Sequence, residues 1–392
     1  MMLNDLTMLP DDPILGLMDL YWQDTRAGKI DLGVGIYKDA QGTAPVMSAV
    51  KQAEAWLLAT QRSKAYTPTA GAAGFNESLG QVVFGQALAS HAQGVQTPGG
   101  TGAVRLAAEF ARRANVGTVL IGTPTWAIHN SIFASASIAT ASFQQLDEQG
   151  AFNLAGLLDA MAALNAGDMV LLQASCHNPT GIDPSAEQWG AILGQVRASG
   201  LVPVFDLAYQ GFGDGLEEDA YAVRLFTEQL PVVLIAVSCS KNFGLYCERT
   251  GSLFVAGTRQ AHLPALKSHL VDLARCIWSM PPAHGAQVVS LILHSAELAT
   301  AWRSELELMR SRIGSLRQLL VDALQIAGVT RFSQLSVQRG MFSNLDCPPA
   351  LVASLRSDHG IYAVGSGRLN VSGLSHANAS SVATALRATL GA

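Results

Sequence analysis

The sequence predicts an α/β protein, with a largely parallel sheet in a large domain and a smaller α+β domain after it. Three observations lead to this prediction: short apolar strands that recur along the chain, a helical pattern between two of them, and a C-terminal region that mixes brief strands with helices. Strands that alternate with helices are joined by crossovers, and they therefore lie parallel in one sheet.

The expected strands each end in a small or polar residue, and their apolar runs are typical of strands buried on both faces. They cover residues 119–121, 169–172, 201–205 and 232–237. Helical patterns are expected over 46–60, 102–114, 186–199 and 282–327, the last long enough for several helices. The C-terminal unit should contain strands at 342–343 and 360–364 and a helix over 378–390.

Length and composition indicate a well-packed globular enzyme, since the 392 residues are 49% hydrophobic and 14% charged. A net charge of −5 without a basic cluster argues against nucleic-acid binding. The N-terminus is acidic, and no apolar run reaches the ~18–20 residues of a membrane span, so a cytoplasmic protein with no membrane partner is expected. The five scattered cysteines predict reduced thiols, and no metal-ligand spacing is present.

Lys241 is the residue that most clearly indicates a reactive group. It follows the apolar run 232–237, so its amine should be partly desolvated, which lowers the pKa of a lysine and frees a nucleophile. Ser238 and Ser240 precede it and Arg249 follows it, and hydroxyls with a guanidinium are groups that bind phosphate. The stretch therefore predicts a lysine that holds a phosphorylated aldehyde.

Other polar or aromatic side chains also follow the expected strands, namely Trp126, His129, Asn178, Asp206 and Tyr209. Ligands of open α/β sheets bind outside the carboxyl ends of the strands, so these side chains should meet in one crevice. Asp206 could hold a protonated pyridine nitrogen and so make a pyridoxal ring an electron sink, with His129 supporting the carboxylate. An aspartate that caps the following turn is an equally good explanation of Asp206 taken alone.

The remaining candidates also have structural explanations. Gly100 and Thr101 precede a helix-forming run and could bind a phosphate at its N-terminus, although a plain cap explains them as well. Trp126 could stack on a pyridine ring or belong to the core. Asn178 and Tyr209 could hydrogen-bond a cofactor oxygen, or serve a turn and the core respectively.

Seven stretches in order carry a more specific signal: 31–39, 99–105, 176–181, 205–213, 238–251, 281–285 and 366–371. Over essentially the whole chain they resemble the fold-type I pyridoxal-phosphate-dependent aminotransferases, in the aspartate and aromatic amino acid subgroup of class I. The resemblance implies a mainly parallel, seven-stranded sheet in a large cofactor-binding domain, 45–308, as in aspartate aminotransferase. Residues 1–44 and 309–392 would form the small domain, and the protein would be a homodimer.

The resemblance also implies roles for individual residues. Lys241, Asp206 and Tyr209 would be catalytic, with Lys241 binding pyridoxal 5'-phosphate covalently and then moving the proton. The cofactor would also contact Gly100, Thr101, Trp126, His129, Asn178, Ala208, Ser238, Ser240 and Arg249, together with Tyr66 from the second subunit. The substrate would contact Gly35, Trp126, Asn178, Arg368 and, across the dimer interface, Arg275.

The implied reaction is a ping-pong transfer of the amino group from an aromatic amino acid (Phe, Tyr or Trp) or aspartate to 2-oxoglutarate. Met280, Trp278 and Ala65 replace residues usual in strict aspartate enzymes and leave room and apolar surface for a ring. Lys38 and Thr101 keep the aspartate-type choice. A strict aspartate aminotransferase and a specialised biosynthetic enzyme on the same fold therefore remain alternatives.

Two other classes fit the sequence less well. A cofactor-binding regulator would need an attached DNA-binding module, for which the chain has neither spare length nor basic charge. A dehydrogenase would need the full dinucleotide fingerprint, which the sequence lacks.

Overall fold

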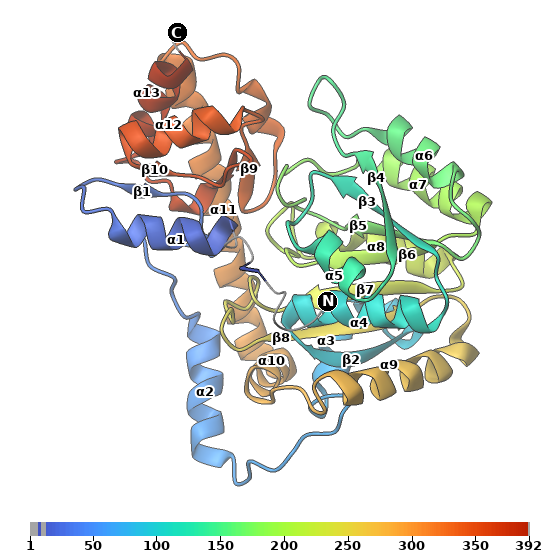
Figure 1. Cartoon of the computed structure of the whole chain (residues 1–392). Helices are drawn as coiled ribbons and strands as arrows, with labels where there is room; N and C mark the ends of the chain where they lie inside the picture. The colour runs from blue at the N-terminus through green and yellow to red at the C-terminus, as the bar shows by residue number, and fades with distance from the viewer. Residues whose placement is uncertain (1–6, 9–12, 391–392) are drawn as a thin grey trace.

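A seven-stranded sheet lies at the centre of the larger part of the molecule, as the computed structural model of residues 7–8 and 13–390 shows (Figure 1). The strand order is β2-β8-β7-β6-β5-β3-β4. The bounds are β2 Ala92–Pro98, β3 Thr118–Thr123, β4 Ala139–Gln144, β5 Met169–Gln173, β6 Val202–Leu207, β7 Val233–Ser238 and β8 Thr250–Ala256. Strand β8 alone runs opposite to the other six strands of this sheet, so the prediction of a mainly parallel, seven-stranded sheet is confirmed.

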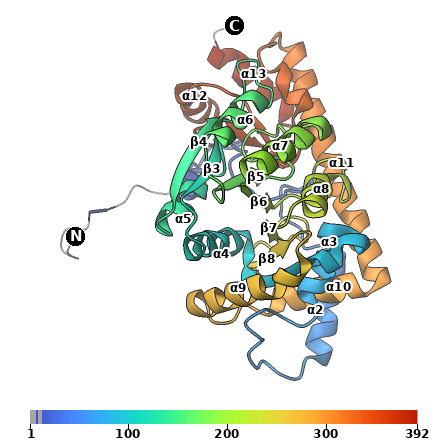
Figure 2. The same cartoon turned by 90° about the vertical axis from the view of Figure 1, so that its right-hand side faces the viewer.

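The strands are apolar throughout because both faces of the sheet are covered. On β5, Val170 and Leu172 pack into one hydrophobic core, whereas Met169 and Leu171 pack into the other. Among the helices that contribute to the first core are α3 (Phe75–Leu88), α6 (Leu154–Ala162), α7 (Ala186–Ser199) and α8 (Tyr221–Gln229). Those of the second are α4 (Gly99–Arg113), α5 (His129–Ser135) and α9 (Leu263–Ile277), and Figure 2 shows the two groups on opposite sides of the sheet.

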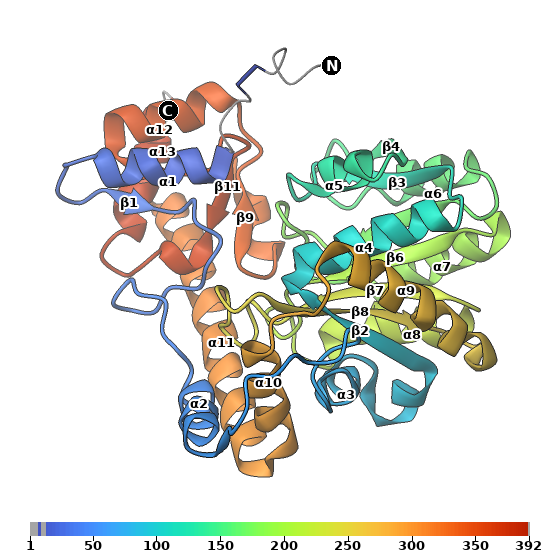
Figure 3. The same ribbon diagram turned by 60° about the horizontal axis from the view of Figure 1, so that its bottom comes forward.

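The smaller part of the molecule combines segments from both ends of the described chain, which lie side by side in Figure 1. Its strands are β1 (Ile30–Asp31), parallel to β10 (Ile361–Tyr362), and β11 (Arg368–Asn370), antiparallel to β9 (Phe342–Asn344). Its helices are α1 (Pro13–Gln23), α12 (Pro349–His359) and α13 (Ala379–Leu390). The three helices α2 (Ser48–Thr60), α10 (His284–His294) and α11 (Ala296–Ile326) lie near one another, and α11 continues into the smaller part (Figure 3). The division at residues 45 and 308 stays a prediction, and its second boundary falls within α11.

One helix begins earlier than expected, and the long helical stretch divides into several helices as expected. The stretch 282–327 forms two helices, α10 and α11, because Ser295 between them has an extended backbone and its side chain caps α11. Helix α4 begins at Gly99, three residues earlier than expected, so the glycine-rich stretch is its first turn. None of the helices in the described ranges is long and apolar enough to cross a membrane.

Candidate active site

A cavity of about 300 Å³ lies at the carboxyl ends of the parallel strands, where the sequence predicts one. Most of the predicted site residues line it together with two that were not predicted: Gly35, Gly100, Thr101, Trp126, Gln173, Asn178, Asp206, Ala208, Tyr209, Ser238, Ser240, Lys241, Tyr246 and Arg249. These side chains come from both parts of the molecule, since Gly35 lies just beyond β1 and the others lie in the segments around the central sheet. Their individual roles stay predictions.

The amine of Lys241 is an available nucleophile in this cavity. Its nitrogen lies 4.7 Å from the centroid of the Tyr209 ring. Burial lowers the pKa of Lys241 to about 8, and the neighbouring Arg249 and Arg368 act in the same direction, while Asp206 opposes them. An amine with this pKa is partly neutral near pH 7 and can attack a carbonyl carbon.

Asp206 lies at the end of β6 and is held by a chain of hydrogen bonds. Its Oδ2 is 3.1 Å from Nε2 of His129, and Nδ1 of His129 is 2.8 Å from the hydroxyl of Thr125. Both Asp206 and His129 are buried. A buried carboxylate that faces a cavity and has one neutral or cationic neighbour can pair with a cationic ring nitrogen in a ligand.

The first turn of α4 lies beside the ends of β2 and β7 and the start of β8. There Gly100, Thr101, Ser238, Ser240 and Arg249 form an anion cradle. Gly99 has a φ of +72°, and a Cβ there would lie 2.7 Å from Nη2 of Arg249. A Cβ on Gly100 would lie 2.9 Å from the Cβ of Ser238. Only glycine allows the helix N-terminus to approach the Ser238 hydroxyl and the Arg249 guanidinium this closely, and these donors together suit a phosphate.

Arg368 is a buried cation at the opposite end of the site. Its Nη1 donates to Oδ1 of Asn178 at 3.3 Å and its Nη2 donates to the carbonyl of Gly33 at 2.8 Å, while the guanidinium lies over the Phe342 ring. Its Nε has no hydrogen-bond partner, and no carboxylate among the described residues forms an ion pair with it. Burial lowers the pKa of Arg368, and a carboxylate ligand would offset that cost.

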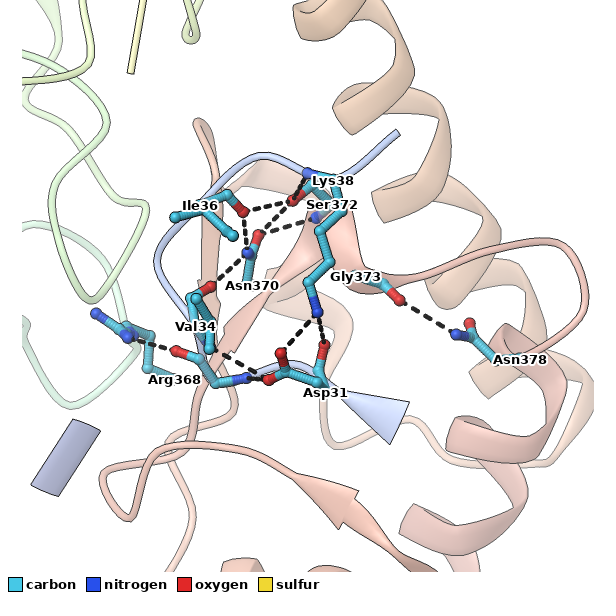
Figure 4. Close-up of polar contacts among 10 residues, drawn as sticks. Asp31, Val34, Ile36, Lys38, Arg368, Asn370, Ser372, Gly373 and Asn378 are labelled. Atoms are coloured by element: carbon cyan, nitrogen blue, oxygen red, sulfur yellow. Dashed lines mark hydrogen bonds and ion pairs between the residues drawn. The ribbon is translucent and has the colours of Figure 1, made fainter. Parts of the chain in front are cut away.

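The loop 33–38, which carries Gly35 into the cavity wall, is fastened to β11. The side-chain amide of Asn370 donates to the carbonyls of Val34 and Ile36, each at 2.6 Å (Figure 4). Asn370 is completely buried, so these two bonds are shielded from water.

Two further contacts in Figure 4 hold Lys38, at the C-terminal end of this loop. The backbone N–H of Lys38 donates to the hydroxyl of Ser372 at 3.1 Å, and the amine of Lys38 pairs with Oδ2 of Asp31 at 2.6 Å. Lys38 is therefore engaged within the smaller part of the molecule and does not line the cavity.

The structure does not bring Tyr66 or Arg275 into the cavity of their own chain. They line a separate hollow of about 740 Å³ together with Ala65, Trp278 and Met280. The side chain of Tyr66 is 88% exposed, and Arg275 contacts the Ser279 hydroxyl and, at 3.6 Å, the Met280 sulfur.

Gln173 and Tyr246 line the cavity but were not among the predicted site residues. Gln173 is the first polar residue after the expected strand 169–172, the same signal that identified Asp206. Tyr246 lies within the stretch 238–251, and its hydroxyl accepts a hydrogen bond from the backbone N–H of Tyr37 at 2.9 Å. Among the described residues, no group of three or more His, Cys, Asp or Glu side chains could hold a metal ion.

Comparison with known proteins gives consistent matches. The sequence model of the family "Aminotransferase class I and II" matches residues 27–386. An aromatic-amino-acid aminotransferase of Pseudomonas aeruginosa is 48% identical over 372 residues, 93% of each chain, and the aspartate aminotransferase of Escherichia coli is 41% identical over 99% of this chain and 100% of that one. A solved aromatic-amino-acid aminotransferase from Burkholderia pseudomallei, described as covalently bound to pyridoxal phosphate, superposes with a TM-score of 0.95 at 38% identity over the full length of both chains.

Proposed function

The chain belongs to the class I and II aminotransferases, and we propose that it is a pyridoxal 5'-phosphate-dependent transaminase that moves the amino group of an aromatic amino acid or aspartate to 2-oxoglutarate. The observation that carries the proposal is the single cavity that holds both the Lys241 amine, with its lowered pKa, and the His129-supported Asp206 carboxylate. A nucleophilic amine opposite a fixed anion is the arrangement that an aldehyde with a basic ring nitrogen requires.

The remaining cavity residues fit this cofactor. The anion cradle of Gly100, Thr101, Ser238, Ser240 and Arg249 suits its phosphate. Trp126 and Ala208 are wall residues that would contact the faces of the ring, and the amide of Asn178 and the hydroxyl of Tyr209, 3.4 Å apart, would contact its phenolic oxygen. When bound, the cofactor supplies an electron sink for the negative charge that develops at the substrate Cα.

The protein's own groups would then bind the substrate and move its proton. Arg368 would take the α-carboxylate, its unpartnered Nε and its two terminal nitrogens offering a planar set of donors. Lys241 would carry the proton as base and then as acid, a role for which its lowered pKa suits it near neutral pH. Burial raises the pKa of Tyr209 well above its usual value, so its hydroxyl stays protonated and remains a hydrogen-bond donor.

Reduction with borohydride tests the cofactor assignment. The purified protein should be yellow, and borohydride should bleach it and leave the cofactor attached to the peptide that contains Lys241, as peptide mass spectrometry would show. A Lys241→Ala variant with full transaminase activity would refute the proposal.

Initial rates with phenylalanine, tyrosine, tryptophan and aspartate, each with 2-oxoglutarate, test the choice of substrate. We expect turnover of both aromatic and dicarboxylic donors, because Met280 and Trp278 present apolar surface in the same hollow as Arg275. Arg275→Leu should lower the rate with aspartate far more than the rate with phenylalanine. Turnover of aspartate alone would indicate the strict aspartate enzyme, and turnover of neither would indicate a specialised biosynthetic enzyme.

We also propose a cytoplasmic homodimer in which Tyr66 and Arg275 complete the partner's site. Their exposure outside the cavity of their own chain supports this, and the five free thiols suit a reducing compartment. Mixing Lys241→Ala with Arg275→Leu under conditions of subunit exchange should restore aspartate turnover, because hybrid dimers contain one intact site. As a control, Lys241→Ala is mixed with the double variant Lys241→Ala/Arg275→Leu, and this mixture should restore no aspartate turnover. If neither mixture restores turnover, Arg275 acts in the site of its own chain.

A further inference from the structure

We infer that Gln173 is a positioning residue that sets the direction of the hydrogen bonds reaching Asp206, and thereby keeps His129 in its neutral, Nε2-protonated form. The inference rests on the proposed function only for its consequence, the binding of a cationic ring nitrogen. Gln173 lies on β5 directly beside Asp206 in the strand register, and its side chain is buried.

The orientation of the Gln173 amide is fixed by backbone groups. Its Oε1 accepts from the N–H of Asn178 at 2.8 Å, and its Nε2 donates to the carbonyl of the same residue at 3.0 Å. A backbone N–H can only donate and a carbonyl can only accept, so the side-chain amide has one orientation that satisfies both. The second N–H of Nε2 is then directed at the Thr125 hydroxyl oxygen, 3.3 Å away.

This donor determines what the Thr125 hydroxyl can do. Gln173 presents an N–H to Thr125 and therefore cannot accept the hydroxyl proton, and among the described residues the other side-chain partner of that hydroxyl is Nδ1 of His129 at 2.8 Å. An unprotonated Nδ1 accepts that proton, and this arrangement leaves the ring proton of a neutral imidazole on Nε2. That proton is donated to Oδ2 of Asp206 at 3.1 Å. The hydrogen bonds of Thr125 and of Asp206 therefore call for the same form of His129.

The consequence is electrostatic. A doubly protonated His129 would cancel the charge of Asp206 and weaken its attraction for a cationic ring nitrogen, whereas a neutral His129 orients the carboxylate and leaves its charge intact. Gln173 suits this task because a carboxamide carries both a donor and an acceptor and does not itself titrate.

Three variants separate this role from simple packing. Gln173→Glu keeps the size of the side chain but replaces the donor to Thr125 by an acceptor. Thr125→Val removes the hydroxyl and leaves the contacts between Gln173 and Asn178 intact. Thr125→Ser keeps the hydroxyl and is the matched control.

The primary measurement is ¹⁵N NMR of the full-length, cofactor-loaded protein labelled at histidine, with His129 assigned by the signal that His129→Asn removes. With all samples at the same pH of about 7.5, the native protein and Thr125→Ser should show the ring proton of His129 on Nε2, whereas Gln173→Glu and Thr125→Val should show a different protonation pattern. We expect both altered variants to bind the cofactor about tenfold more weakly.

An unchanged His129 signal in Gln173→Glu would overturn the inference, and so would a change in that variant that Thr125→Val does not reproduce. If Gln173→Glu does not fold, the comparison of Thr125→Val with Thr125→Ser still tests the inference, because only Thr125→Val removes the hydroxyl that links Gln173 to His129. A native protein that binds no pyridoxal phosphate would instead refute the proposed function, and the ¹⁵N signals of that protein would still report the form of His129.

Discussion

The lowered pKa of Lys241 can be measured directly and perturbed in both directions. With the pKa reduced from its ordinary value of 10.5 to about 8, about one amine in ten is neutral at pH 7, roughly 300-fold more than for an unperturbed lysine. Burial is the main cause, and the nearby charges modify it: Asp206 raises the pKa of the amine, whereas Arg249 and Arg368 lower it. Removing one of these charges should therefore shift the pKa with a predictable sign.

Pulsed chemical labelling of the cofactor-free protein provides the assay. Brief exposure to an amine-reactive reagent across a pH series, with peptide mass spectrometry of the Lys241 peptide and a small amine as the reference for reagent reactivity, gives the midpoint of the titration. The midpoint should lie near pH 8 in the native protein, lower in Asp206→Asn and higher in Arg368→Met. A native midpoint near the ordinary value, or a shift of both variants in the same direction, would refute this account of the site.

Three further predictions concern other parts of the molecule. Arg368→Lys should lower kcat/KM for every amino donor by about 100-fold, because an ammonium cannot supply the planar set of donors, and an equal rate for the variant would show that Arg368 is structural. Gly99→Ala should weaken phosphate-dependent cofactor binding by at least about tenfold, measured by equilibrium dialysis, since the residue has φ +72° and the added Cβ would meet Arg249; undiminished affinity would exclude the cradle. Burial raises the pKa of Asp219 to about 6, so the stability that its protonated form contributes, about 3 kcal/mol, is present below pH 3.8 and is lost as the pH rises past 6. Asp219→Asn should flatten the pH dependence of the urea midpoint between about pH 4 and about pH 6, and an unchanged slope would contradict this.

The sequence predicts which strand-end residues meet in the cavity because one physical rule governs their position. Apolar runs buried on both faces of a sheet must end where the chain meets solvent, so the polar residue after each run marks the crevice, as Asp206 and Lys241 show. Gln173 follows the same rule, but the prediction named only Asn178 for the polar end of that strand.

Other features depend on contacts that no local pattern contains. Strand β8 was not predicted. Its first three residues are small or polar and only 253–256 are apolar, so its bounds depend on pairing with β2 and β7. The bond between Arg368 and the carbonyl of Gly33 joins residues 335 positions apart. Such a contact follows from the packing of the two ends of the chain.

The hydrogen bonds of Asn370 bear on how enzymes of this shape can acquire new substrates. They tie the loop 33–38 to β11, the strand that also carries Arg368, whereas the anion cradle is built from the ends of β2, β8 and β7. The 3.3 Å bond between Arg368 and Asn178 joins β11 to the segment after β5, which lies outside the anion cradle. On the proposed roles, substitutions in the loop would change substrate preference more than cofactor affinity, and selection could then adjust the two properties in separate steps.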